Sequence, residues 1–263
     1  MKNIKMIVID LDNTLLHTDK SISDYTIDIF EKCRAKDIRI VYATARSQKS
    51  SERFINIISP DAVISNGGAL ARFGENIVYS CVIPQTTADE LIKSYAGLSD
   101  IGYITVETSN NDYFVNYPID MNHKGWVDYY HAVPKDFSKG IDDDVYKITL
   151  EADNKASVFG VAAKYPQVSI MSFAGENWYR LAHTDADKWV AIRHLAEYLK
   201  ISNSDIVSFG DDYNDIEMIK ECGIGVAVAN AIDEVKAAAD YICDTNDNDG
   251  VAKWLEENII KLK

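Results

Sequence analysis

The sequence lacks the features that mark several specialised classes of protein. Its four cysteines are widely spaced and include no C-x-x-C pair, which is typical of reduced, mostly buried thiols rather than of a zinc site or a disulfide framework. The five histidines also lack the spacing of metal ligands. No stretch approaches the roughly 18 apolar residues that a membrane span needs, and the apolar run at residues 6–9 is too short for a signal-peptide core. We therefore expect a cytoplasmic protein that does not enter membranes.

Positive charge is scarce as well. Acidic residues outnumber basic ones by 41 to 27, which gives a formal net charge of -14, and no Lys/Arg-rich run offsets it locally. Such a chain repels nucleic acid and anionic membranes, so we expect neither as a partner. A small anionic ligand would need local positive charge or a bound cation. The composition, 47% hydrophobic and 26% charged, is ordinary for a globular protein and leaves the oligomeric state open.

Both ends of the chain alternate short apolar runs with amphipathic stretches. The predicted strands are 6–9, 38–42, 62–64, 206–209, 224–228 and 241–243, and the predicted helices include 25–36, 51–58 and 189–199. This alternation predicts a parallel sheet with right-handed crossover connections.

The middle of the chain has an antiparallel pattern instead. Two hairpins are predicted at 103–117 and 168–182, with a strand at 145–150 and a helix near 154–164 between them. The predicted fold class is therefore α/β: a Rossmann-like parallel-sheet core domain of residues 1–80 and 187–263, with an α+β domain inserted at 81–186.

Polar residues follow four of the predicted parallel strands. Asp10, Thr44, Asn66 and Asp211 each come at or near the end of a strand. Because the carboxyl ends of parallel strands share one edge of the sheet, these residues should meet in one crevice. Each cluster alone would be explained more simply as a turn or a helix cap. The two acidic motifs together, D-x-D-x-T and G-D-x-x-N-D, are harder to explain in that way.

Five carboxylates would crowd this crevice and repel one another unless a cation lay among them. They belong to Asp10, Asp12, Asp211, Asp212 and Asp215. Oxygen ligands with few histidines nearby are typical of a Mg²⁺ site.

The same motifs resemble those of the haloacid dehalogenase superfamily. D-L-D-N-T-L-L at 10–16 is similar to its first motif, with Asn13 where glycine is usual, and A-T-A-R at 43–46 is similar to the second, with Ala45 replacing a glycine. Lys188 fits the third motif, although Trp189 follows it in place of a small residue, and G-D-D-Y-N-D at 210–215 fits the fourth. The insertion falls between the second and third motifs, as in the Cof-type sugar-phosphatase-like branch. The phosphoglucomutase-like and phosphonatase-like branches carry theirs earlier.

The resemblance implies a magnesium-dependent phosphatase that acts on small phosphorylated metabolites, with sugar phosphates foremost. It implies that Asp10 is the nucleophile that forms an aspartyl-phosphate and that Asp12 is the general acid and base. The implied phosphate-binding residues are Thr44, Ala45, Lys188 and Asn214. The implied metal ligands are Asp10, Asp12 (through its backbone carbonyl), Asp211 and Asp215, with Asp212 a weaker, outer candidate.

The inserted domain would act as a cap that selects the substrate. The candidates there are Asn122, His123, Trp126 and Arg180, while Asn66 and Gly67 are expected at the floor of the crevice. Two other functions remain open. One is a phosphomutase acting on hexose phosphates, which the cap position alone does not exclude. The other is a signalling module phosphorylated on Asp10, which is disfavoured because such modules carry no large insertion. A catalytically silent relative is disfavoured because every required group is present.

Overall fold

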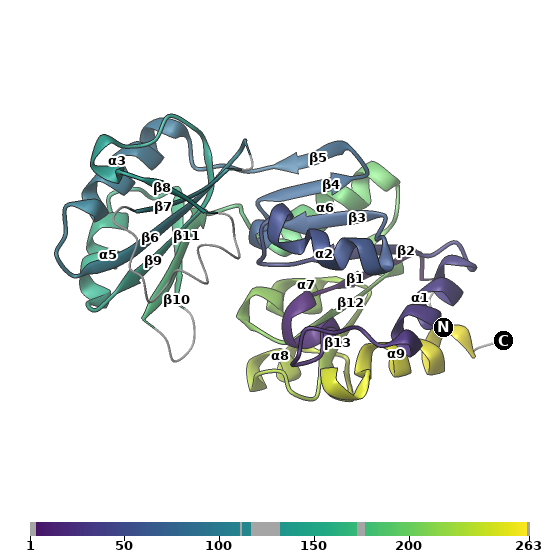
Figure 1. Ribbon diagram of the computed structural model, residues 1–263. Coiled ribbons are helices and arrows are strands. Elements are labelled where there is room, and N and C mark those ends of the chain that lie inside the picture. Colours follow the sequence, from purple (N-terminus) through teal and green to yellow (C-terminus); the bar gives the residue numbers. More distant parts are fainter. Residues whose placement is uncertain (1–3, 111, 117–131, 173–176, 262–263) are drawn as a thin grey trace. The chain divides into compact units, whose positions relative to one another are not determined.

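The computed structural model describes residues 4–110, 112–116, 132–172 and 177–261. The chain folds into two compact units (Figure 1). Met1–Ser80 and Asp187–Lys263 form the first, which we call the core unit, and Cys81–Ala186 forms the second, which we call the inserted unit. None of the described helices has both the length and the apolar composition needed to cross a membrane.

The core unit is built on an eight-stranded sheet in the order β14-β13-β12-β1-β2-β3-β4-β5. Its parallel strands are β1 (Met6–Ile9), β2 (Arg39–Ala43), β3 (Ala62–Ser65), β12 (Ile206–Gly210), β13 (Ile224–Val228) and β14 (Tyr241–Cys243). All four residues of β1 are completely buried, as expected of a central strand covered on both faces. These strands confirm the predicted α/β core with a parallel sheet.

Helices cover both faces of this sheet. They are α1 (Asp24–Arg34), α2 (Gln48–Ile58), α6 (Lys188–Leu199), α7 (Ile216–Glu221), α8 (Asp233–Ala238) and α9 (Gly250–Leu255). Helix α1 packs with α2 and α9 on one face, and α7 packs with α6 and α8 on the other (Figure 1). Successive strands are added on one side of β1 through β2 and β3, and on its other side through β12, β13 and β14. Right-handed crossovers that run in these two opposite directions place their helices on opposite faces of the sheet.

Two antiparallel strands at one edge of the sheet were not predicted. Strands β4 (Leu70–Phe73) and β5 (Asn76–Ser80) form a hairpin that extends the sheet beyond β3. Its turn contains Gly74 at φ +55°, a left-handed conformation that favours glycine. The two runs are short and mix apolar with polar residues, because β5 is largely exposed.

The inserted unit is an α+β fold, as predicted. Its six-stranded sheet has the order β10-β11-β9-β6-β7-β8, and all its pairings are antiparallel except that of β7 with β8. The strands are β6 (Ile101–Thr108), β7 (Tyr113–Asn116), β8 (Val133–Lys135), β9 (Val145–Ala152), β10 (Val168–Ser172) and β11 (Trp178–His183). Helices α3 (Gln85–Ala96) and α5 (Lys155–Ala162) pack with the sheet around their own apolar cluster.

Helix α3 was not predicted, although the sequence carries a helical pattern there. After Pro84, which precedes the helix in sequence, the buried residues recur at helical spacing: Ala88, Leu91, Ile92 and Tyr95. Further short turns of the described residues lie at Leu11–Leu15, Asn66–Gly68, Phe137–Lys139, Asn203–Asp205, Tyr213–Asp215, Asn246–Asn248 and Glu256–Ile260.

Candidate active site

Three carboxylates meet at the carboxyl edge of the parallel sheet. Asp10 directly follows β1, and Asp211 and Asp215 come from the turn after β12. The strands pair in register with Ile9 opposite Phe209, so their ends lie side by side. One carboxylate oxygen from each of the three aspartates lies within 4.8 Å of the others. We call these three residues the carboxylate cluster.

Lys188, the first residue of α6, is the cation of this cluster. Its Nζ lies 2.6 Å from Asp10 Oδ1 and 2.7 Å from Asp215 Oδ1, and its side chain is 2% exposed. Burial lowers the pKa of Lys188, but the charges of Asp10 and Asp215 outweigh it and raise that pKa above its usual value. Lys188 therefore remains charged in the folded protein.

A glycine allows Lys188 to reach this position. Gly68, in the turn after β3, has φ +101°, and a Cβ atom there would lie 2.1 Å from the backbone carbon of Asp187. The chain at the start of α6 thus packs directly on the backbone of Gly68. Asp187 caps the helix, because its side chain accepts hydrogen bonds from the N–H groups of Trp189 and Val190.

One ammonium group does not neutralise three buried carboxylates. Burial raises the pKa of Asp10 well above its usual value in spite of Lys188, and the neighbouring aspartates raise it further. Burial, followed by the charge of Asp215, raises the pKa of Asp211 to about 7, although the Thr14 hydroxyl donates a 2.6 Å hydrogen bond to it. The other oxygen of Asp215 accepts from the N–H groups of Asp211 and Asp212. Excess negative charge and converging oxygens fit a small divalent cation such as Mg²⁺.

Asp12 and Asp212 stand apart from this cluster, in contrast to the predicted group of five. The carboxylate of Asp12 is held by Arg46, at 2.6 and 2.7 Å, and by Lys20, at 2.9 Å. Partial burial raises the pKa of Asp12, but the hydrogen bonds and charges of Arg46 and Lys20 lower it below its usual value overall. Asp212 is exposed and accepts from the N–H of Tyr213, so it serves as the cap of that turn.

The turn that carries Asp12 explains one departure from the family motif. Asn13 has φ +59°. Asparagine adopts this left-handed conformation more readily than most residues, which is why it can stand where glycine is usual. The backbone oxygen of Asn13 accepts a 2.7 Å hydrogen bond from the side chain of Asn230, which fixes the turn.

The expected phosphate-binding residues lie at the same edge of the sheet. Thr44, which follows β2, is 1% exposed, and its Oγ1 accepts a hydrogen bond from the N–H of Arg46. Gly67 and Asn66 donate from their N–H groups to the carbonyls of Thr44 and Arg46, so the ends of β2 and β3 are tied together. Ala45 is half-buried within this turn.

Asn214 is half-buried in the turn between Tyr213 and Asp215. Of the candidates in the inserted unit, Arg180 is buried on β11 and donates to the carbonyl of Ala186 at 3.4 Å. Asn122, His123 and Trp126 lie outside the described residues.

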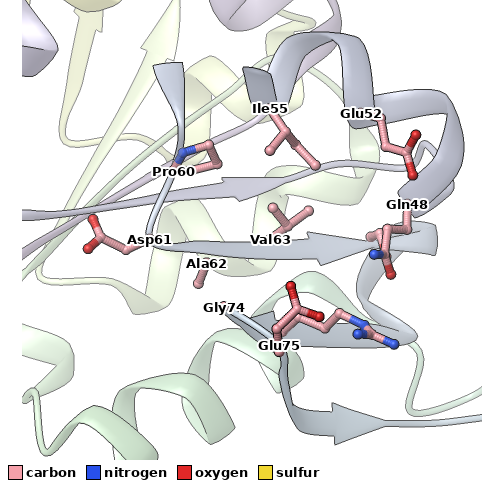
Figure 2. Close-up of a pocket in the computed structure, with 11 residues that line it drawn as sticks. Gln48, Glu52, Ile55, Pro60, Asp61, Ala62, Val63, Gly74 and Glu75 are labelled. Atoms are coloured by element: carbon pink, nitrogen blue, oxygen red, sulfur yellow. The ribbon is translucent and has the colours of Figure 1, made fainter. Parts of the chain in front are cut away.

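A cavity elsewhere in the core unit is separate from this chemistry. It has a volume of about 270 Å³ and is lined by one side of α2, with Gln48, Glu52 and Ile55, and by β3 and β4 (Figure 2). No member of the carboxylate cluster lines it, and Asp61 at its wall is already paired with Arg39 at 2.7 Å. The cluster, rather than this cavity, is the candidate active site.

Comparison with known proteins agrees with this geometry. Residues 7–255 match the model of a family described as haloacid dehalogenase-like hydrolases. The chain belongs to this family. It is 30% identical to the putative phosphatase YxeH of Bacillus subtilis, over 97% of this chain and 98% of that protein. It is 27% identical to YcsE of the same bacterium, named a 5-amino-6-(5-phospho-D-ribitylamino)uracil phosphatase, over 98% of this chain and 97% of that protein.

A solved structure extends the likeness to the fold. The haloacid dehalogenase subclass IIB sugar phosphatase BT4131 superposes with a TM-score of 0.80 at 26% identity, covering 96% of this chain and 98% of its own. Family, relatives and neighbour together confirm the Cof-type branch and place this haloacid dehalogenase-like hydrolase among phosphatases that act on phosphorylated substrates.

Proposed function

We propose that this hydrolase removes phosphate from small phosphorylated metabolites, with sugar phosphates as the substrate class, through an aspartyl-phosphate on Asp10. The observation that carries the proposal is the buried cluster of Asp10, Asp211 and Asp215 around Lys188. A nucleophilic carboxylate can approach an anionic phosphate only where positive charge offsets both. Lys188 supplies one such charge, and the oxygen donors of the cluster fit a second from Mg²⁺.

The substrate class is supported by the chemistry in the names of two similar proteins. BT4131 is named a sugar phosphatase, and the substrate in the name of YcsE carries its phosphate on a ribityl chain. Both descriptions concern phosphate on a polyhydroxylated carbon chain. We extend that common feature to this chain.

The reaction would proceed in two displacements at phosphorus. In the first, a carboxylate oxygen of Asp10 forms a bond to phosphorus while the bond to the leaving oxygen breaks, and Asp12 gives that oxygen a proton. In the second, a water molecule attacks the phosphorus of the aspartyl-phosphate, Asp12 accepts its proton, and Asp10 is released with inorganic phosphate.

The remaining residues would bind the phosphate and the metal. Lys188 and Thr44, with the backbone at Ala45 and the side chain of Asn214, would hold the phosphate oxygens. Asp10, Asp211 and the backbone carbonyl of Asp12 would ligate Mg²⁺, with Asp215 as a further ligand or support. When bound, Mg²⁺ supplies the positive charge that brings carboxylate and phosphate together. Two N–H groups at the start of α6 already donate hydrogen bonds to the side chain of Asp187, so they are not available to bind phosphate. The ammonium of Lys188 is therefore the main positive charge that this helix would present to the phosphate.

The inserted unit, Cys81–Ala186, would act as the cap that selects the organic part of the substrate. The groups of the core unit that we assign to phosphate do not distinguish one phosphate ester from another. Recognition of the sugar would therefore fall to side chains of the inserted unit.

The test is a panel of phosphorylated metabolites assayed for released phosphate, with Mg²⁺ and with excess chelator. We expect phosphate release from hexose and pentose phosphates with Mg²⁺ and none in chelator. Asp10→Asn should abolish turnover and phosphoenzyme formation without changing the circular dichroism spectrum. Asp233→Asn, at a fully exposed position on α8, is the matched control and should behave as the wild type. Full activity of Asp10→Asn would show that Asp10 is not the nucleophile.

The identity of the product separates hydrolysis from the mutase alternative. With hexose 1-phosphate, a phosphatase yields free sugar and inorganic phosphate in equal amounts. A phosphomutase yields hexose 6-phosphate without net release of phosphate, and that result would replace the function proposed here.

A further inference from the structure

The carboxylate of Asp12 accepts hydrogen bonds from two cations, Arg46 and Lys20. The guanidinium of Arg46 donates from Nε to one carboxylate oxygen of Asp12, at 2.6 Å, and from a terminal nitrogen to the other, at 2.7 Å. Lys20 Nζ donates to the second oxygen at 2.9 Å. This two-pronged contact fixes the plane of the carboxylate as well as its place, which a single hydrogen bond would not do.

The backbone around Arg46 is itself rigidly placed. Its N–H donates to the hydroxyl of Thr44, and its carbonyl accepts a 2.7 Å hydrogen bond from Asn66. The guanidinium lies over the ring of Phe54, 4.9 Å from the ring centre, and the side chain is only 14% exposed. Phe54 is buried in α2. The guanidinium of Arg46 is therefore held in one orientation, so its two hydrogen bonds to Asp12 cost little further side-chain entropy.

The loop that carries Lys20 is anchored to the opposite end of the core unit's sequence. Thr18 donates from its backbone and its hydroxyl to Asp247, and His17 lies 3.0 Å from a carboxylate oxygen of Asp249. Lys20 is less enclosed than Arg46, with a side chain 36% exposed against 14%. Of the two cations, Arg46 is the one with the geometry to set the direction of Asp12.

We propose that Arg46 is a positioning residue, which holds the carboxylate of Asp12 in the direction of the water that attacks in the second step. This inference rests on the proposed function. It assigns Arg46 no contact with the substrate. A general acid or base misplaced by about 1 Å can lose on the order of a hundredfold in rate. Loss of Arg46 should therefore act through Asp12 and be felt only while Asp12 is present.

A double-mutant cycle measures this dependence directly. The cycle comprises the wild type, Arg46→Ala, Asp12→Ala and the double variant, and its readout is hydrolysis of the phosphoenzyme formed from p-nitrophenyl phosphate with saturating Mg²⁺. This substrate is chosen because its leaving group needs no protonation, so every member of the cycle can form the phosphoenzyme. We expect Arg46→Ala to slow hydrolysis by roughly 30- to 100-fold in the wild type and by less than about threefold in Asp12→Ala.

Two further variants separate positioning from simple loss of charge or of packing. Arg46→Lys keeps the charge but not the two-pronged contact, so we expect it to recover only part of the lost rate. Arg53→Ala removes another guanidinium from the ring of Phe54, 4.3 Å from its centre, at an exposed position of α2, and should leave the rate unchanged. Thermal unfolding of each variant checks the fold, and Arg46→Gln replaces Arg46→Ala if the latter is unstable.

The outcomes are distinct. Equal losses in both backgrounds, or a raised KM with kcat unchanged, would overturn the proposal and make Arg46 a direct ligand of the substrate. An unchanged rate in Arg46→Ala would overturn it as well. If the wild type releases no phosphate from any substrate of the panel, the proposed function fails and this inference fails with it. If the wild type is active and Arg46→Ala hydrolyses the phosphoenzyme at the same rate, only the positioning role of Arg46 is refuted.

Discussion

The ammonium nitrogen of Lys188 lies 2.6 Å from a carboxylate oxygen of Asp10, and the two side chains are 2% and 9% exposed. The same nitrogen lies 2.7 Å from Asp215. A buried charge is tolerated only when it is paired, and here one cation serves two carboxylates, with a third close by. Lys188 thus both permits the crowding of the cluster and supplies the positive charge that an incoming phosphate would meet.

We predict that Lys188→Ala lowers kcat by at least roughly a hundredfold, because it removes a charged contact from the transition state. It should also destabilise the protein without added metal by about 3–5 kcal/mol, since it leaves buried carboxylates uncompensated. Steady-state kinetics and urea unfolding measure the two effects. Lys220→Ala removes a lysine that pairs with Glu217 on the surface and serves as control. A Lys188→Ala variant with wild-type kcat would show that Lys188 contributes only to the fold.

The close approach of Gly68 to Asp187 leads to a second prediction. Gly68→Ala would bring a Cβ atom to 2.1 Å from the backbone of Asp187 at φ +101°, where side chains are strained. We expect a loss of about 3 kcal/mol or more in unfolding free energy, together with reduced kcat because Lys188 is displaced. Gly74→Ala is the matched control: φ is +55°, but nothing lies within 4 Å of the added Cβ. It should cost about 1 kcal/mol and leave kcat unchanged. Equal effects of the two substitutions would refute the packing argument.

The raised pKa of Asp211 predicts how pH and metal act together. Its ordinary value is 3.8, and burial with the Asp215 charge brings the pKa to about 7 in the folded protein. The folded state therefore binds this proton more tightly than the unfolded state. The metal-free protein should lose the corresponding stability as the pH rises from about 4 to about 7.

Mg²⁺ should reverse this loss, because it replaces the proton among the carboxylates. We expect the rise in Tm on adding Mg²⁺ to be small at pH 5 and large at pH 8, as measured by thermal unfolding across that range. Asp211→Asn should reduce the rise and flatten its dependence on pH. A rise that is equal at all pH values, or larger at pH 5, would contradict the assignment of Asp211 to the metal.

The sequence was sufficient to predict that Asp10, Asp211 and Asp215 lie together, but not which cation each carboxylate faces. Apolar runs such as Met6–Ile9 identify buried parallel strands, and the ends of such strands share an edge, so Asp10 and Asp211 could be placed together. Spacing along the chain does not say which cation a carboxylate will face. The two hydrogen bonds from Arg46 to Asp12 depend on side-chain directions at two separate strand ends, and they were not predicted.

Elements with weak patterns were also missed. The hairpin of β4 and β5 lies at the edge of the sheet, so its residues are not selected for complete burial and show no continuous apolar run. Its importance for the site is indirect: α6, which begins at Lys188, packs against both strands.

The final prediction separates the two aspartates of the first motif by leaving group. Protonation of the departing oxygen matters for a sugar alkoxide, which is a poor leaving group, and little for p-nitrophenolate. Asp12→Ala should therefore slow phosphoenzyme formation much more with a sugar phosphate than with p-nitrophenyl phosphate. Activation of water is needed for both substrates, so the aryl ester should give a burst of p-nitrophenolate followed by slow release of phosphate. Asp10→Asn should give no burst. If single-turnover kinetics of Asp12→Ala show the same loss in the first step for both leaving groups, Asp12 is not the general acid, and its role reduces to supporting the turn and the metal.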